Sequence, residues 1–196
     1  MWPSLLVFVV VATITPGGAT TLATASGTQH GLRRSLPLIA GIALGLASLA
    51  AASSLGLGSL LQAFPALNLA MQIAGSAYLL YLAWRVASAG RPNADSKSLR
   101  QPISFTGAAA LLWLNPKGWA VTLSAAVSFS TLAANPWTLA AILATAFASA
   151  ALVSLTLWCL IGRALGQFLR ADRHWQIANW TLGGLLALSI SALWIE

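Results

Sequence analysis

The sequence has very few acidic, histidine and cysteine residues. Its 196 residues include 3 Asp and Glu, 2 His and 1 Cys, and only 7% are charged while 58% are hydrophobic. Soluble domains carry about 25% charged residues and about 45–50% apolar ones. The shortage of charge therefore excludes an ordinary soluble enzyme and an intrinsically disordered protein.

Positive charge is more abundant, with 10 Lys and Arg residues and a net charge of +7. These residues stand in short clusters between long apolar runs and form no basic stripe, so we expect no nucleic acid partner. Basic clusters that flank apolar runs are typical of a membrane protein. We therefore expect membrane lipid as the surroundings of the chain.

Long uncharged runs predict transmembrane helices, because a helix needs about 20 apolar residues to cross a bilayer. Turn-forming Gly, Pro and Asn residues divide the longest runs. The sequence predicts an all-α membrane protein with residues 1–196 in a single membrane domain. The six predicted spans cover residues 2–24, 36–58, 67–88, 105–128, 137–160 and 176–195.

The distribution of basic residues predicts the topology. All Lys and Arg residues except Lys117 lie at the ends of, or in the loops after, the first, third and fifth predicted helices. Cytoplasmic loops are enriched in Lys and Arg, so both termini are expected outside. Residues 1–88 and 105–196 then form two three-helix repeats joined by a cytoplasmic loop, 89–104. An odd number of helices in each repeat inverts the second repeat relative to the first.

Two of the predicted helices contain breaks. Residues 15–18 read Thr-Pro-Gly-Gly, and residues 115–118 read Asn-Pro-Lys-Gly. Proline removes a backbone donor inside a helix, and the freed carbonyls must then be buried in protein or face a wet cavity. Paired breaks in inverted repeats favour a transport site at the midplane, although two structural kinks without a ligand would give the same pattern.

Lys117 would lie roughly 18 Å into a hydrocarbon core about 30 Å thick, and no Asp or Glu lies in any predicted span. An intramembrane lysine is costly and is a functional candidate. It could hold a substrate carboxylate, with Trp113 near enough for a cation–π contact, or it could satisfy carbonyls of the broken helix. The candidate substrate-binding and translocation residues are Thr15, Pro16, Gly17, Gly18, Thr20, Thr21, Trp113, Asn115, Pro116, Lys117 and Trp119.

Tryptophan is frequent, with nine residues. Seven of them fall near the ends of predicted helices, where aromatic side chains anchor a protein at the membrane interface. These seven are Trp2, Trp84, Trp137, Trp158, Trp175, Trp180 and Trp194. Trp113 and Trp119 lie inside the predicted fourth helix and do not fit such a belt.

Other functional classes lack the residues that they need. The two histidines, His30 and His174, stand near predicted cytoplasmic ends, away from the serines that an intramembrane protease would use. A thiol-reductant carrier needs a cysteine pair, and Cys159 is alone. A metal exporter would need acidic or histidine ligands in the membrane. We expect no enzymatic activity, no metal site and no cofactor.

Four stretches of the chain resemble the LysE/RhtB family of amino-acid exporters. They are residues 15–17 with 25–27, Arg33-Arg34 ahead of Gly41 and Gly45, residues 75–84, and Phe105 and Gly107 ahead of 114–117. The resemblance covers essentially the whole chain. It implies a multi-pass carrier in a bacterial inner membrane that exports amino acids or close derivatives, is driven by the proton gradient and forms a homodimer.

The first family motif is usually Pro-Gly-Pro followed by Asn-type residues, whereas this chain has Pro16-Gly17-Gly18 followed by Ala19 and Thr20. The change makes the turn more flexible and less polar. We predict a secondary transporter that exports an amino acid by alternating access, with a neutral zwitterion or an acid fitting Lys117 better than a cation. The alternative is a membrane assembly or scaffold subunit that does not transport.

Overall fold

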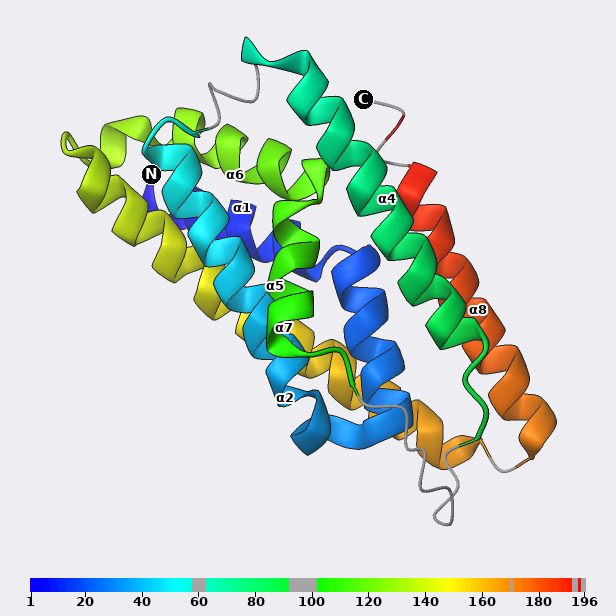
Figure 1. The fold of residues 1–196 in the computed structure, drawn as a ribbon. Helices are drawn as coiled ribbons and strands as arrows, with labels where there is room; N and C mark the ends of the chain where they lie inside the picture. The colour runs from blue at the N-terminus through cyan, green and yellow to red at the C-terminus, as the bar shows by residue number, and fades with distance from the viewer. Residues whose placement is uncertain (58–62, 92–101, 170, 192–193, 195–196) are drawn as a thin grey trace.

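The computed structural model describes residues 1–57, 63–91, 102–169, 171–191 and 194, and these residues form helices and connecting turns with no strand. This agrees with the predicted all-α class. The helices are α1 (Trp2–Ile14), α2 (Gly18–Ser54), α4 (Pro65–Ala87), α5 (Phe105–Trp113), α6 (Pro116–Ser128), α7 (Pro136–Phe168) and α8 (Asp172–Ser191), with a short 3-10 turn at Ser130–Leu132 (Figure 1).

Element α2 is a helical hairpin and not one straight helix. Gly31 has a φ of 72°, which glycine adopts without steric strain, and the chain reverses its direction there (Figure 1). The Ser26 and Ser35 hydroxyls lie 2.7 Å apart across the bend. Residues nine apart in a straight helix are separated by roughly 13 Å, so this bond requires α2 to consist of two limbs. The first limb is residues 18–30 and the second is residues 32–54. The exposed Arg33 and Arg34 follow the bend, where the sequence predicts a basic loop.

Several predicted helix ends need correction. The predicted second helix, 36–58, ends earlier at Ser54, and the predicted fifth helix, 137–160, continues to Phe168. The basic residue Arg163 therefore lies inside α7. Helix α8 begins at Asp172, four residues before the predicted start. Most of the predicted loop 89–104 lies outside the described residues.

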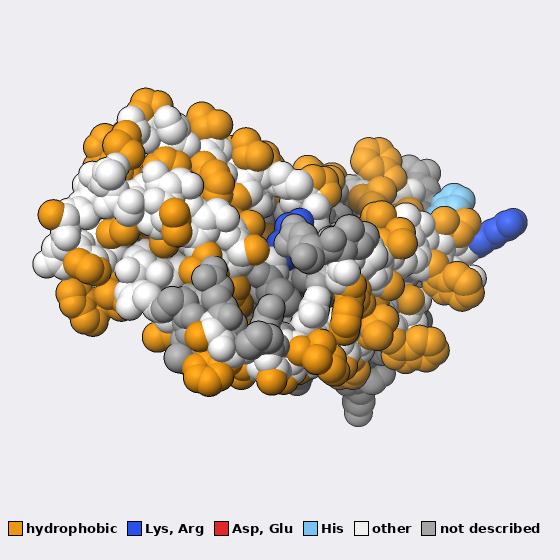
Figure 2. Space-filling view, turned by 90° about the horizontal axis from the view of Figure 1, so that it is seen from above, with side chains coloured by type: hydrophobic (Ala, Val, Ile, Leu, Met, Phe, Trp, Pro, Cys, Tyr) orange, Lys and Arg blue, Asp and Glu red, His pale blue; other side chains and the backbone are white. Residues whose placement is uncertain are grey.

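Two described helices have the length and hydropathy of a membrane span, namely α2 with a mean hydropathy of 1.9 and α7 with 2.0. The shorter α1 is also apolar. Large apolar side chains point outward from several helices, including Trp84 at 72% exposure and Val127 at 75%. Hydrophobic side chains are spread over the face shown in Figure 2, where no acidic side chain of the described residues is visible. Such an exposed apolar surface suits lipid better than water.

Glycines set the closest helix crossings in the molecule. A Cβ added to Gly27 of α2 would collide with the Cys159 carbonyl of α7, and one added to Gly162 of α7 would collide with the Thr24 carbonyl of α2. Gly41 meets the Phe105 carbonyl of α5 in the same way. Backbones approach this closely only where small residues permit it, as is usual between membrane helices.

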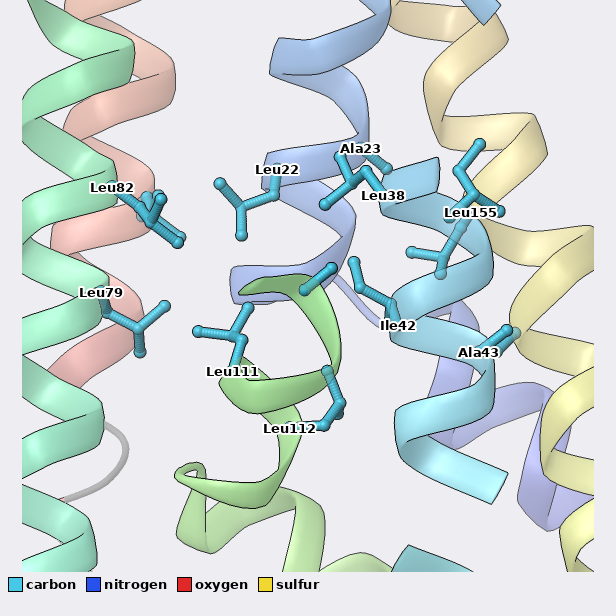
Figure 3. Close-up of a cluster of buried hydrophobic side chains, with 14 of the residues drawn as sticks. Leu22, Ala23, Leu38, Ile42, Ala43, Leu79, Leu82, Leu111, Leu112 and Leu155 are labelled. Carbon is cyan, nitrogen blue, oxygen red and sulfur yellow. The ribbon is translucent and has the colours of Figure 1, made fainter. Parts of the chain in front are cut away.

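The largest apolar core of the described residues lies between both limbs of α2 and helices α4, α5, α7 and α8, with Trp119 of α6 at its edge. Leu22, Leu79 and Leu111 come from α2, α4 and α5, are almost fully buried, and point toward one another in Figure 3. Helices α4 and α8 lie side by side (Figure 1). This core joins the α4–α8 pair to the rest of the molecule.

Candidate functional site

The first predicted break is present between α1 and α2. Helix α1 ends at Ile14, Thr15 and Pro16 are exposed, and Gly17 is extended with a φ of −175°. The buried Thr20 hydroxyl accepts a hydrogen bond from the Gly17 N–H at 2.8 Å and donates one to the Gly17 carbonyl at 2.9 Å. Thr20 thus satisfies a donor at the start of α2 that no helical carbonyl can reach.

The carbonyls freed at the end of α1 are held by side chains of α7. Ser154 donates to the Thr13 carbonyl at 2.8 Å, and the Trp158 indole donates to the Ile14 carbonyl at 3.2 Å. In an unbroken helix these carbonyls would accept from residues 17 and 18. The break is therefore satisfied by a helix that is about 140 residues away in sequence. This provides the internal hydrogen bonding that a bilayer demands.

The second predicted break is present between α5 and α6. Helix α5 ends at Trp113, and α6 starts at Pro116 with Asn115 as its N-cap. The Asn115 side-chain oxygen accepts from the Lys117 N–H at 3.0 Å. The Trp113 carbonyl, which would accept that N–H in an unbroken helix, accepts instead from the Trp119 indole at 2.9 Å. This break is satisfied from within its own helix pair.

The tryptophans at the second break pack against each other and against α2. The rings of Trp113 and Trp119 meet edge-to-face with centroids 5.3 Å apart, and the Trp113 indole donates to the Ser48 hydroxyl at 3.0 Å. Trp119 is 5% exposed, whereas Trp113 is 37% exposed. The cation–π contact described by the structure is Arg85 over Tyr81, so the predicted contact between Lys117 and Trp113 is not among those of the described residues.

Lys117 is exposed in the isolated chain, at the first turn of α6. The ion pair among the described residues joins Arg91 and Asp172 at 3.4 Å, on the surface at the start of α8. The Lys117 ammonium therefore has no carboxylate within 4 Å in the described part of the chain. A cation beside the N-terminus of a half-helix creates a local positive potential that favours an anionic group.

The two breaks lie against one apolar core but make different polar contacts. Leu22, just after the first break, and Leu112 and Trp119, around the second, belong to the same buried cluster. Among the hydrogen bonds of the described residues, none joins residues 15–21 to residues 113–119. A Cβ on Gly18 would contact Leu79, Leu186 and Ser189. The remaining predicted residue, Thr21, is half-buried one position after Thr20.

Sequence reasoning missed the α7 side chains that hold the first break. Trp158 was predicted near a helix end but lies well inside α7, and its indole bonds to Ile14. The sequence did not predict a role for Ser154, because a single serine in an apolar helix can serve several purposes. The spacing of one helical turn between Ser154 and Trp158 could have suggested a shared face.

Comparison with known proteins gives a family match over nearly the whole chain. The model of the LysE type translocator family matches residues 10–191, which include both breaks. The chain belongs to this family.

Curated relatives of the chain are bacterial efflux proteins. The cysteine/O-acetylserine efflux protein of Klebsiella pneumoniae subsp. pneumoniae is 29% identical over 193 residues, covering 97% of this chain and 95% of that protein. The protein of the same name in Escherichia coli K12 is 34% identical over 60% of this chain and 61% of its own length. The one in Salmonella paratyphi A is 32% identical over 56% of this chain and 55% of its own. No solved structure matches the chain. Family and relatives together identify a bacterial membrane protein of the exporter type.

Proposed function

We propose that this chain is a secondary transporter that exports a small amino acid or a close derivative across the bacterial inner membrane by alternating access. The observation that carries the proposal is the pair of proline breaks, with Lys117 at the start of the half-helix α6 and no carboxylate near it among the described residues. Paired broken helices are a common way to build a substrate site at the midplane of a transporter.

The proposed topology has six spans in two inverted repeats, 1–88 and 105–196. In this arrangement α1 with the first limb of α2 forms the first span, the second limb of α2 forms the second, and α5 with α6 forms the fourth. Figure 1 supports it, because the bend of α2, the end of α7 and the start of α8 lie at the bottom of the view while both termini lie in its upper half. The end of the molecule that carries the basic residues, at the bottom of this view, is then cytoplasmic.

In the proposed site, the substrate carboxylate binds near Lys117 and the N-terminus of α6, and backbone groups of Pro16, Gly17 and Gly18 orient the rest of the amino acid. An ammonium and the positive end of a helix both favour a carboxylate. The names of the relatives suggest cysteine and O-acetylserine as the first substrates to test. We include coupling to the proton gradient and a homodimer in the proposal on the strength of the family resemblance.

The test is efflux of labelled amino acids from proteoliposomes, with O-acetylserine and cysteine beside neutral, acidic and basic amino acids. We expect saturable efflux of a few small neutral substrates, and loss of this efflux in Lys117→Ala. A protonophore should abolish uptake that is driven by an imposed pH gradient.

Full efflux by Lys117→Ala would remove Lys117 from the site. Absence of efflux by correctly inserted wild-type protein across the whole panel would contradict the transporter proposal and favour an assembly role. Lys117→Arg is the matched control, since it keeps the charge while changing its shape.

A further inference from the structure

A buried amide joins three separate segments at one end of the seam between the α4–α8 pair and the rest of the molecule. Asn179 of α8 is 1% exposed. Its side-chain oxygen accepts a hydrogen bond from the Gln29 side chain of α2 at 2.7 Å. Its side-chain nitrogen donates to the carbonyl of Ala89, just after α4. We call Gln29, Asn179 and the Ala89 carbonyl the amide latch.

Beyond the amide latch the seam is apolar. Leu22 of α2 faces Leu79 and Leu82 of α4 (Figure 3), and Leu186 of α8 is buried in the same cluster. Gly18, at the far end of the first limb of α2, approaches Leu186 closely, since an added Cβ would lie 3.6 Å from its side chain. The same limb of α2 is thus held against α8 by leucines along its length and by the amide latch at its end.

The amide latch lies at the end of the molecule that carries the basic residues. Gln29 stands two residues before the Gly31 bend, with the exposed Arg33 and Arg34 beyond it. The exposed ion pair between Arg91 and Asp172 joins the chain after α4 to the start of α8. Both residues of this pair belong to the α4–α8 side, so the pair does not cross the seam, whereas the bond between Gln29 and Asn179 does.

A buried amide behaves differently from a leucine when helices separate. While the seam is closed, the buried Asn179 amide needs its partners, because a buried unpaired polar group costs about 1–3 kcal/mol. When the seam opens to water, the same groups exchange protein partners for water with little net loss. The contact therefore disfavours partly open, dry arrangements and permits a fully wet one. This is the energy profile of a gate with two states.

We propose that the amide latch is the cytoplasmic gate of the transport pathway, closed in this structure, and that substrate loads when α8 separates from the first limb of α2. The inference rests on the proposed function for its direction of transport. In structural terms, residues 18–30 of α2 separate from helix α8 at the end that carries the basic residues, and Asn179 controls this separation.

The first test measures opening without measuring transport. Leu186→Cys in a Cys159→Ser background places one reactive thiol on the seam behind the amide latch. A membrane-impermeant maleimide is added to the cytoplasmic side of inverted vesicles. Adding Asn179→Leu, which removes the bond to Gln29 across the seam at similar side-chain size, should raise the labelling rate roughly two- to tenfold, the factor expected from losing one net hydrogen bond.

The controls separate a gate from a general loss of fold. Thr181→Val alters an exposed α8 residue whose hydroxyl bonds only to its own helix, and it should leave the labelling rate unchanged. Gln29→Leu removes the same contact across the seam from the other side, so it should raise the labelling rate by a similar factor. An unchanged rate in both latch variants, or an increase from the periplasmic side only, would overturn the proposal.

The second test locks the gate. Cysteines replace Gln29 and Asn179 and are joined by a short bis-methanethiosulfonate, because two long side chains that meet at their tips leave their Cβ atoms too far apart for a disulfide. The crosslink should abolish O-acetylserine efflux, and reduction should restore it. Undiminished efflux in the crosslinked protein would refute the gate while leaving the transporter proposal intact. Increased labelling in a protein that transports nothing would support the gate and contradict the proposed function.

Discussion

The two proline breaks have the same form but are stabilised in different ways. At the second break, Asn115 caps the Lys117 N–H and Trp119 satisfies the Trp113 carbonyl, so every partner lies within six residues. At the first break, the Thr13 and Ile14 carbonyls depend on Ser154 and Trp158 of α7. The second break is a local structure that carries a charge, and the first is an uncharged structure held by a distant helix. Under the proposed function, the second break binds the charged part of the substrate, and the first break stays attached to α7.

The largest expected effect is on efflux, and it should differ between Lys117 and Gly17, the residues that directly follow the two prolines. Lys117→Ala should reduce efflux by roughly 30-fold or more, as losing one member of a charge pair with the substrate does. Gly17→Ala should reduce it by less than about threefold, because Gly17 has an extended φ of −175° and an added Cβ would meet only the Thr15 carbonyl at 4.0 Å. Initial efflux rates at equal protein density measure both. Similar losses in the two variants would refute the division of roles.

A second prediction concerns the donors that satisfy the freed carbonyls. Ser154→Ala at the first break and Trp119→Phe at the second should each lower stability by about 1–3 kcal/mol, because each leaves a carbonyl without its partner. Thermal unfolding in detergent, followed by circular dichroism, measures the loss.

The two changes should also add to within about 0.5 kcal/mol in the double variant, since no hydrogen bond of the described residues links the breaks. A large coupling would mean that the breaks act as one structural unit. Ser149→Ala offers a control on α7, because the Ser149 hydroxyl bonds only within its own helix.

The N-cap of α6 should have a smaller effect. Asn115→Ala should lower stability by about 1 kcal/mol, because it removes the acceptor for the Lys117 N–H. Asn115→Ser can still cap the helix and should retain most of the stability. The midpoint of thermal unfolding distinguishes the two variants, and equal midpoints would show that the cap contributes little.

The smallest effect is expected at Thr15. Its hydroxyl donates to the Val11 carbonyl of its own helix at 2.6 Å, and the residue is exposed. Thr15→Val should change stability by less than about 0.5 kcal/mol and leave the efflux rate unaltered. A marked loss of efflux at normal stability would instead place the Thr15 hydroxyl in the substrate site.

Part of the candidate site could be predicted from the sequence because its causes are local. Pro16 and Pro116 each stand where one helix has ended and the next begins, as expected of a residue without a backbone donor, whereas Pro37 lies inside α2 without ending it. Asn115 caps α6 through an atom two residues from its partner. The contact between Lys117 and Trp113 was also predicted from spacing, but Trp113 bonds to Ser48 and packs on Trp119 instead. Helical spacing determines which residues are near each other, but it does not determine which of the nearby residues a side chain contacts.

The sequence by itself determined the membrane class, the all-α fold and the positions of the two breaks, because hydropathy and proline geometry act over a few residues. Only the tertiary structure decided that α7 satisfies the first break and that Asn179 meets Gln29, partners about 150 residues apart. It also placed the predicted reversal between the first two spans at Gly31 and brought α2 against α7 at Gly27 and Gly162. Contacts of this kind depend on how whole helices cross, and a buried polar group takes the partner that the crossing brings within reach.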